Sequence, residues 1–278
     1  MNMTITCGTR RLSLHKPRIM GIINVTPDSF FAGSRCATQT EILERASLMA
    51  AHGVDIFDVG AYSTRPGAFD VSETEELQRL TAALDVLTQH FPQIMLSVDT
   101  FRANVVERLY DRYGPFIVND VTGGEADPQL LAVTARLQLP YVIMHSRGNP
   151  QTMQQLTDYD DVVHEVITYL QRKMELCTLM GIRRVILDPG FGFAKTVKQN
   201  YRLFHHIDTM IGLGAPLLIG ISRKTMVWKP LDITPEKALM ATTALHLQAL
   251  LQGAHILRVH DVEAAKQMIT LCGLLKTS

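Results

Sequence analysis

Eight short apolar runs recur along this chain, each followed by a polar or glycine-rich cluster and then by a helical stretch. The runs occupy residues 19–24, 54–60, 94–99, 116–120, 141–145, 185–188, 217–220 and 256–260. Nearly continuous apolarity in pieces of strand length is typical of a parallel sheet buried on both faces. Eight such units in alternation with helices predict an α/β fold, namely a closed (β/α)8 TIM barrel.

The length of the chain agrees with one such barrel. It has 278 residues, of which 46% are hydrophobic, and a (β/α)8 barrel takes roughly 250 residues. We therefore predict a single domain over residues 1–278. Residues 4–14 carry a Cys-Gly-Thr turn between two alternating pieces, which predicts a β-hairpin that closes one end of the barrel. Helix-start signals stand at Ser72–Glu75 and at Thr234–Glu236.

Charge and cysteine usage exclude several classes of protein. The 27 basic residues balance 27 acidic ones, so no global field would attract nucleic acid or a membrane surface. The four cysteines form no Cys-x-x-Cys pair, which argues against zinc sites and disulfide frameworks. The chain shows no signal peptide and no apolar run of about 18 residues. These features predict a soluble cytoplasmic enzyme or binding protein without nucleic-acid or membrane partners.

Three polar residues stand at the ends of predicted strands. Asp99, Asn119 and Asp188 fall near or at the ends of the third, fourth and sixth runs, and in such barrels the loops after the strands form the active face. Two carboxylates and an amide can hydrogen-bond a flat heterocycle with several N–H donors and a carbonyl. Each residue alone is more often a helix cap or a turn residue, and only the coincidence of all three on one face favours a site.

A second group of residues is suited to anions. Ser222–Thr225 follows the seventh run and Arg258–His260 closes the eighth, where barrels often bind phosphate. The alternative is a solvated cluster of charges. Two early segments, Asn24–Phe30 and Ser63–Gly67, combine proline with hydroxyls and an amide or guanidinium. They suit a cover over a charged substrate, although composition alone would make them turns.

Taken together, these segments resemble the dihydropteroate synthase family over nearly the whole chain. The motifs stand in the order of the family at Ile23–Phe30, Ser63–Gly67, Ser97–Thr100, Asn119–Gly124, Leu187–Phe193, Ser222–Lys224 and Arg258–Asp261. The resemblance implies a transferase of folate biosynthesis and a target of sulfonamides. Its reaction joins 6-hydroxymethyl-7,8-dihydropterin diphosphate to 4-aminobenzoate and yields 7,8-dihydropteroate and pyrophosphate.

The resemblance also implies roles for individual residues. Pterin-binding side chains would be Asp99, Asn119, Met144, Asp188, Lys224 and Arg258. The diphosphate would contact Asn24, Thr64, Arg65, Arg258 and His260. The 4-aminobenzoate would lie against Phe30, Pro66, Phe193, Lys224 and Thr225. The catalytic set would be Asp99, Lys224, Arg258 and His260, with Mg²⁺ held by the side-chain oxygen of Asn24 and a homodimer formed through late helices.

The chain departs from the usual family pattern at three places. Ala61-Tyr62 stands where a Gly-Glu pair is common, Ser146-Arg147 where Met-Gln is frequent, and Thr225 where serine is frequent. Arg147 predicts an additional cation near the mouth of the pocket. Two other functions stay open: a methyltetrahydrofolate-type pterin methyltransferase, which needs no diphosphate-binding residues, and a non-catalytic pterin-binding paralogue. Asn24, Arg65 and His260 favour the synthase.

Overall fold

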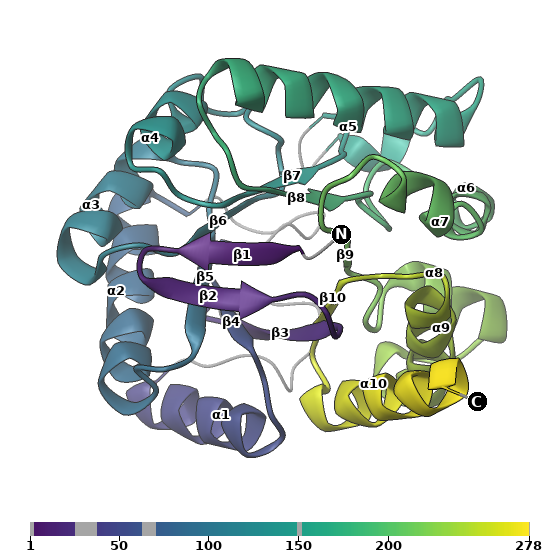
Figure 1. Cartoon of the computed structure of the whole chain (residues 1–278), viewed down its shortest axis with the longest axis horizontal. Helices are drawn as coiled ribbons and strands as arrows, with labels where there is room; N and C mark the ends of the chain where they lie inside the picture. Colours follow the sequence, from purple (N-terminus) through teal and green to yellow (C-terminus); the bar gives the residue numbers. More distant parts are fainter. Residues whose placement is uncertain (1–2, 26–37, 63–70, 149–151, 278) are drawn as a thin grey trace.

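Eight parallel strands form a ring in the computed structural model, which describes residues 3–25, 38–62, 71–148 and 152–277 (Figure 1). They are β3 (Arg18–Asn24), β4 (Ile56–Gly60), β5 (Met95–Asp99), β6 (Ile117–Asp120), β7 (Tyr141–Met144), β8 (Val185–Asp188), β9 (Leu218–Ile219) and β10 (Ile256–Val259). Their order in the sheet is β8-β7-β6-β5-β4-β3-β10-β9. A parallel bridge between Leu187 and Leu217 joins the two outer strands, so the predicted closed barrel is confirmed.

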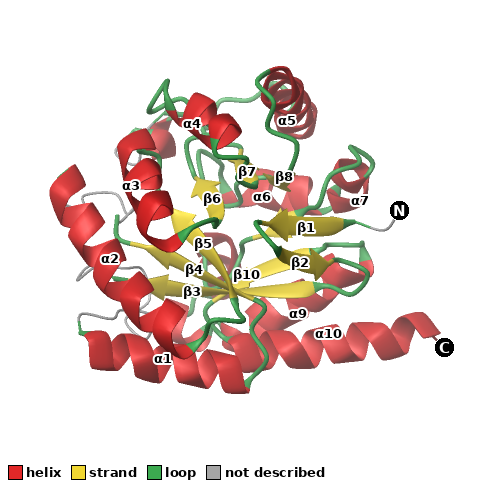
Figure 2. Cartoon of the chain, turned by 60° about the vertical axis from the view of Figure 1, so that its left-hand side comes forward, coloured by secondary structure: helices red, strands yellow, loops and turns green. Residues whose placement is uncertain are grey.

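Helices surround this ring on the outside (Figure 2). They are α1 (Gln39–Ala51), α2 (Glu73–His90), α3 (Ala103–Tyr113), α4 (Leu130–Arg136), α5 (Val162–Leu179), α6 (Val197–Phe204), α7 (Ile207–Ile211), α8 (Thr225–Trp228), α9 (Leu239–Leu251) and α10 (Val262–Thr277). Three 3-10 turns, Met153–Gln155, Lys229–Leu231 and Pro235–Lys237, complete the described helical elements. None of the described helices is both long and apolar enough to cross a membrane.

Two helix-start predictions are only half right. Ser72 caps α2 by accepting a hydrogen bond from the backbone N–H of Glu75 at 3.3 Å, but the Glu75 carboxylate pairs with Arg79 on the next turn rather than with Ser72. The residues after Thr234 form a 3-10 turn, and the α-helix begins later, at Leu239. At Ser72 the cap forms, and Arg79 competes for the carboxylate that the sequence signal assigns to the helix start.

The side chains inside the barrel form an apolar floor at the start of each strand. Because successive side chains of a strand point to opposite faces, alternate residues pack outward on the helices. The inward set is Met20, Ile56, Met95, Ile117, Val142, Ile186, Leu218 and Ile256.

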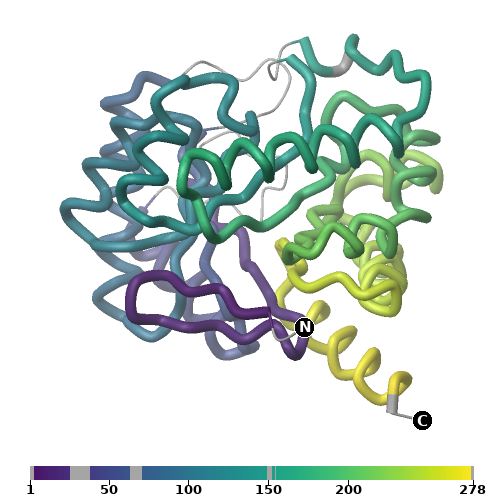
Figure 3. Tube along the Cα trace, turned by 45° about the horizontal axis from the view of Figure 1, so that its top comes forward, coloured from purple at the N-terminus to yellow at the C-terminus, as the bar shows by residue number. Residues whose placement is uncertain are grey.

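An antiparallel hairpin seals this floor from below. β1 (Thr4–Cys7) pairs with β2 (Arg10–Ser13) and lies across one end of the barrel (Figures 1 and 3). Ile5 and Cys7 are buried and pack in the same apolar cluster. The predicted hairpin is therefore confirmed, and it covers the end of the barrel at which the strands start.

Candidate active site

The barrel interior changes from apolar to polar within one step along the strands. Two residues beyond the floor, the next inward positions are mostly polar: Asp58, Ser97, Asn119, Asp188 and Arg258. Met144 and Gly220 occupy the corresponding positions of β7 and of the chain after β9. The three strand-end residues predicted from the sequence, Asp99, Asn119 and Asp188, therefore reach one common region above the floor.

Asp58 lies at the centre of this polar layer, and the sequence analysis missed it. Its side chain is fully buried. It accepts hydrogen bonds from Ser97 Oγ at 2.6 Å, from Asn119 Nδ2 at 3.1 Å and from Arg258 Nε at 2.7 Å. The sequence signal that could have identified Asp58 is its place inside an apolar run, because a carboxylate in the middle of a buried strand requires partners.

Arg258 connects Asp58 to the predicted site residue Asp99. Its Nη2 atom lies 2.6 Å from Asp58 Oδ2 and 2.9 Å from Asp99 Oδ2. Burial alone would lower the pKa of Arg258, but the two carboxylates raise it above its usual value. The guanidinium is therefore a permanent cation at the wall of the pocket.

The carboxyl group of Asp99 is poised to titrate near neutral pH. Burial raises the pKa of Asp99 to about 7 against the opposing effect of Arg258, and the negative charge of Asp58 adds to the rise. Asp99 therefore carries a charge that is incompletely balanced by its surroundings.

A second set of charges converges around Gly220. A Cβ atom placed on this glycine would lie 3.8 Å from Asp188 Oδ2, 3.8 Å from Lys224 Nζ and 3.9 Å from Arg258 Cβ. The missing side chain thus leaves space between three predicted site residues. Burial raises the pKa of Asp188, whereas burial lowers the pKa of Lys224 to about 8 and Asp188 opposes that fall.

Lys224 also contacts the loop that follows β8. Its Nζ atom donates a hydrogen bond to the Phe191 carbonyl at 2.7 Å and lies 4.6 Å from the centre of the Phe193 ring. The predicted residue Met144 is buried at the end of β7, in register with Asp188 on β8. Thr225, the residue after Lys224, is exposed at the start of α8.

Asn24 and Asp99 flank Gly60 in the strand register. A Cβ atom on Gly60 would lie 3.7 Å from Asn24 Oδ1 and 3.3 Å from Asp99 Cβ, so the glycine lets these two side chains lie close to the strand between them. Amide and carboxylate oxygens suit Mg²⁺, which keeps several waters and binds to substrate phosphates. No cluster of three or more His, Cys, Asp or Glu side chains suited to a metal occurs in the described part of the chain.

His260 contributes a neutral imidazole to the site. Burial and, next, Arg258 lower the pKa of His260 to about 3. Its Nδ1 atom lies 3.0 Å from Ser222 Oγ, and Arg45 of α1 donates to its backbone carbonyl. His260 can therefore offer a hydrogen bond, but no positive charge, to an anion.

Several motif residues next to the site are structural. Asp120 is buried and accepts hydrogen bonds from Gly124 N at 2.6 Å and Tyr141 Oη at 2.7 Å. Arg223 forms a two-point ion pair with Asp261 at 2.8 and 2.9 Å, which ties together the loops after β9 and β10.

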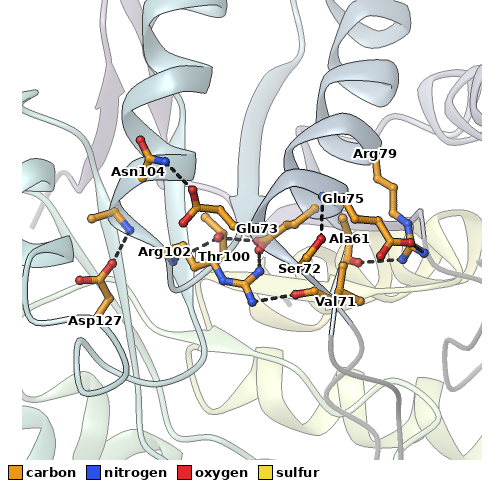
Figure 4. A network of polar contacts seen from close by, with 12 residues as sticks. Ala61, Val71, Ser72, Glu73, Glu75, Arg79, Thr100, Arg102, Asn104 and Asp127 are labelled. Atoms are coloured by element: carbon orange, nitrogen blue, oxygen red, sulfur yellow. Dashed lines mark hydrogen bonds and ion pairs between the residues drawn. The ribbon is translucent and has the colours of Figure 1, made fainter.

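The turn after β5 is held by a buried ion pair (Figure 4). Thr100, next to Asp99, donates to the buried carboxylate of Glu76 at 2.6 Å. Arg102 pairs with Glu76 and donates to the Val71 carbonyl at 2.8 Å. Tyr62, at a departure from the family pattern, packs edge-on against Phe101 at 5.3 Å between ring centres.

Arg147, at a second of the three departures, does not act as a free cation at the mouth. It pairs with Glu165 of α5 and stacks on the Tyr159 ring at 3.7 Å. Four predicted site residues lie outside the described residues: Phe30, Thr64, Arg65 and Pro66. The structure therefore brings together Asn24, Asp99, Asn119, Met144, Asp188, Phe193, Lys224, Thr225, Arg258 and His260 at the open end of the barrel.

The chain is similar to known proteins over almost its full length. The model of a family described as pterin binding enzyme matches residues 20–260. Dihydropteroate synthase of Escherichia coli is 41% identical over 254 residues, which cover 91% of this chain and 89% of that protein.

Solved structures agree with this similarity. The structure of Yersinia pestis dihydropteroate synthase in a complex with a sulfonamide drug has a TM-score of 0.94 and 36% identity, covering 99% of this chain and 100% of that one. Dihydropteroate synthase from Thermus thermophilus in complex with 4-aminobenzoate has a TM-score of 0.88 and 35% identity, covering 98% and 100%.

Replacement of Asp58 tests the central ion pair. Asp58→Asn keeps the shape of the side chain but removes its charge, leaving the buried guanidinium of Arg258 with one carboxylate. We expect the free energy of unfolding to fall by about 3–5 kcal/mol, as is usual when one partner of a buried pair is lost. Urea denaturation measures this change in the free energy of unfolding.

Glu107→Gln is the matched control, because Glu107 pairs with Arg136 on the surface. Loss of such an exposed pair costs about 1 kcal/mol or less. Equal effects of the two substitutions would mean that Asp58 is not the anchor of Arg258.

Proposed function

This chain belongs to the family of pterin-binding enzymes, among the dihydropteroate synthases, and from that membership we propose that it joins 6-hydroxymethyl-7,8-dihydropterin diphosphate to 4-aminobenzoate. The products are 7,8-dihydropteroate and pyrophosphate. The observation that carries the proposal is the convergence of Asp188, Lys224 and Arg258 around Gly220. Residues 1–278 would act as one pterin-binding barrel domain, and a cytoplasmic location stays a prediction from cysteine usage.

The pterin occupies the polar layer in this proposal. Asp99, Asn119 and Asp188 supply acceptors and a donor for its ring edge, and Lys224 supplies a further donor. Met144 packs against the ring, and the guanidinium of Arg258 lies at a ring face. Arg258 is suited to this because Asp58 and Asp99 hold it in place by ion pairs.

The diphosphate lies toward the ends of β3 and β10. Asn24, Arg258 and His260 contact it, together with Thr64 and Arg65, and Asn24 is also the proposed protein ligand of Mg²⁺. When bound, Mg²⁺ would neutralise charge on the departing diphosphate. Arg258 supplies the fixed positive charge of this set, while the neutral His260 supplies a hydrogen bond.

The 4-aminobenzoate lies beside the loop that follows β8, against Phe30, Pro66 and Phe193, with its carboxylate near Lys224 and Thr225. Its amine nitrogen attacks the pterin methylene carbon, and the C–O bond to the diphosphate breaks with its electron pair on oxygen. The amine then loses a proton. Positive charge develops on the methylene carbon, and the ionised Asp99 stabilises it.

We infer that a second copy of this chain covers the late helices. Large apolar side chains are exposed on α9 and α10, namely Leu239, Met240, Leu251, Leu271, Leu274 and Leu275. The two helices pack on each other, and the end of α10 extends away from the rest of the trace (Figure 3). Clustered exposed apolar side chains of this kind mark protein interfaces.

The reaction itself is the first test. Purified protein mixed with the pterin diphosphate, Mg²⁺ and 4-aminobenzoate should release pyrophosphate and dihydropteroate together, and removal of Mg²⁺ by a chelator should abolish both. Asp99→Asn and Lys224→Ala should each lower kcat/KM by about 100-fold or more, because they remove transition-state interactions.

Circular dichroism should show that both variants are folded. Lys198→Ala, an exposed lysine of α6, is the control and should keep full activity. Pterin binding without either product would refute the synthase and favour a methyltransferase or a non-catalytic paralogue.

The pH profile of kcat/KM is the second test, because it reports groups of the free enzyme. Asp99 must be ionised, so activity should rise as the pH passes about 7. Lys224 must be protonated, so activity should fall as the pH passes about 8. In the Asp99→Asn variant, the rise of kcat/KM on the acid side of the pH profile should disappear from the residual activity. An unchanged rise would mean that another group causes it.

The dimer is tested by sedimentation velocity. Met240 on α9 is 83% exposed and Leu179 on α5 is 85% exposed, so glutamate at either position should be tolerated by the fold. Met240→Glu should convert a dimer into a monomer, whereas Leu179→Glu should leave it intact. A monomeric wild-type protein, or dissociation by both changes, would contradict an interface at α9 and α10.

A further inference from the structure

A buried lysine outside the proposed site holds the loop on which that site depends. Lys195 follows β8 by seven residues, and only 4% of it is exposed. Its Nζ atom lies 2.9 Å from the Gly190 carbonyl, 3.0 Å from the Phe193 carbonyl and 2.9 Å from His145 Nδ1. One amine therefore joins both ends of the turn 190–193 to the residue that follows β7.

The two loops meet backbone to backbone at this point. A Cβ atom on Gly190 would lie 1.9 Å from the His145 carbonyl oxygen, and Gly190 has a positive φ of 67°. Only glycine fits there. The backbone N–H of His145 also donates to the Asp188 carbonyl at 3.0 Å. Contacts on the buried side of the turn 190–193 thus fix its position relative to the loop after β7.

On its open side the same turn contacts two proposed site residues, Asp188 and Lys224, and carries a third, Phe193. Gly190 N donates to Asp188 Oδ1 at 2.8 Å. The Phe191 carbonyl accepts from Lys224 Nζ, and the Phe193 ring lies beside the same amine. Displacement of the turn would therefore move the Asp188 carboxylate, the Lys224 amine and the Phe193 ring together.

We propose that Lys195 is a positioning residue for the reaction, which fixes the turn 190–193 against the loop after β7 and so places Asp188, Lys224 and Phe193. Lys195 does not reach the substrates. The inference rests on the proposed roles of the three residues that it places.

The environment of Lys195 suits a fixed amine rather than a mobile charge. None of its three partners carries a negative charge, and burial lowers the pKa of Lys195 well below its usual value. Burial lowers the pKa of His145 to about 2, so the ring is neutral. Whichever of Lys195 Nζ and His145 Nδ1 carries the hydrogen that they share, the two carbonyls accept the remaining N–H groups of the amine, so every group has a partner.

Lys195→Met tests the proposal, because it keeps the aliphatic length and removes the amine. We expect kcat/KM to fall about 10- to 100-fold, the scale expected for misplaced groups, and KM for 4-aminobenzoate to rise. A defect in folding alone would reduce the amount of active enzyme and lower the apparent kcat without changing KM. Lys198→Met on the exposed side of α6 is the matched control and should match the wild type.

His145 provides a second, independent pair of variants. His145→Asn keeps a polar atom near the position of Nδ1 and should retain the wild-type KM, whereas His145→Leu should resemble Lys195→Met. The double variant Lys195→Met/His145→Leu should be no worse than either single one.

KM values within about twofold of the wild type in folded Lys195→Met would overturn the inference. If that variant does not fold, an unchanged KM in His145→Leu would do so. Wild-type protein assayed alongside distinguishes failure of this inference from failure of the proposed function. Absence of product with the wild-type protein would refute the synthase activity itself.

Discussion

Charges inside a closed barrel are tolerated only when they are paired, and here the pairing is organised around the guanidinium of Arg258. It lies between Asp58, below it in the barrel, and Asp99, at the mouth. An unpaired ion at this depth would be prohibitively costly. Asp58 also accepts from Ser97 and Asn119, so one buried carboxylate orients side chains of three other strands. The proposed pterin-binding residues are therefore oriented before any substrate binds.

The floor below this network makes the arrangement possible. Eight apolar side chains and the hairpin β1–β2 fill the lower barrel, which keeps water from reaching the ion pairs from beneath. The polar layer begins only one inward position higher. Burial at this boundary raises the pKa of Asp99 and lowers that of Lys224, so the fold itself brings both groups toward neutral pH.

The strands could be predicted from the sequence because each is a continuous apolar run with a polar end; the predicted run 94–99, for example, is β5 at Met95–Asp99. Asp58 could not be predicted in this way because it stands in the middle of such a run, away from the polar strand ends. The partners of Tyr62 and Arg147 could not be predicted, because Phe101 and Glu165 come from other elements. Which motif residue faces the pocket follows from the two-residue period of the strand: Asn119 faces inward and its neighbour Asp120 anchors a turn.

The balance of charge in the pocket bears on the proposed chemistry. Three carboxylates, Asp58, Asp99 and Asp188, face two cations, Arg258 and Lys224. Asp58 shares Arg258 with Asp99, and Lys224 offsets Asp188, so Asp99 is left with incompletely compensated charge. This excess is unfavourable in the free enzyme, as its raised pKa indicates. The negative charge of Asp99 becomes favourable when positive charge appears on the pterin methylene. The desolvation that raises the free energy of the resting site would therefore stabilise the transition state.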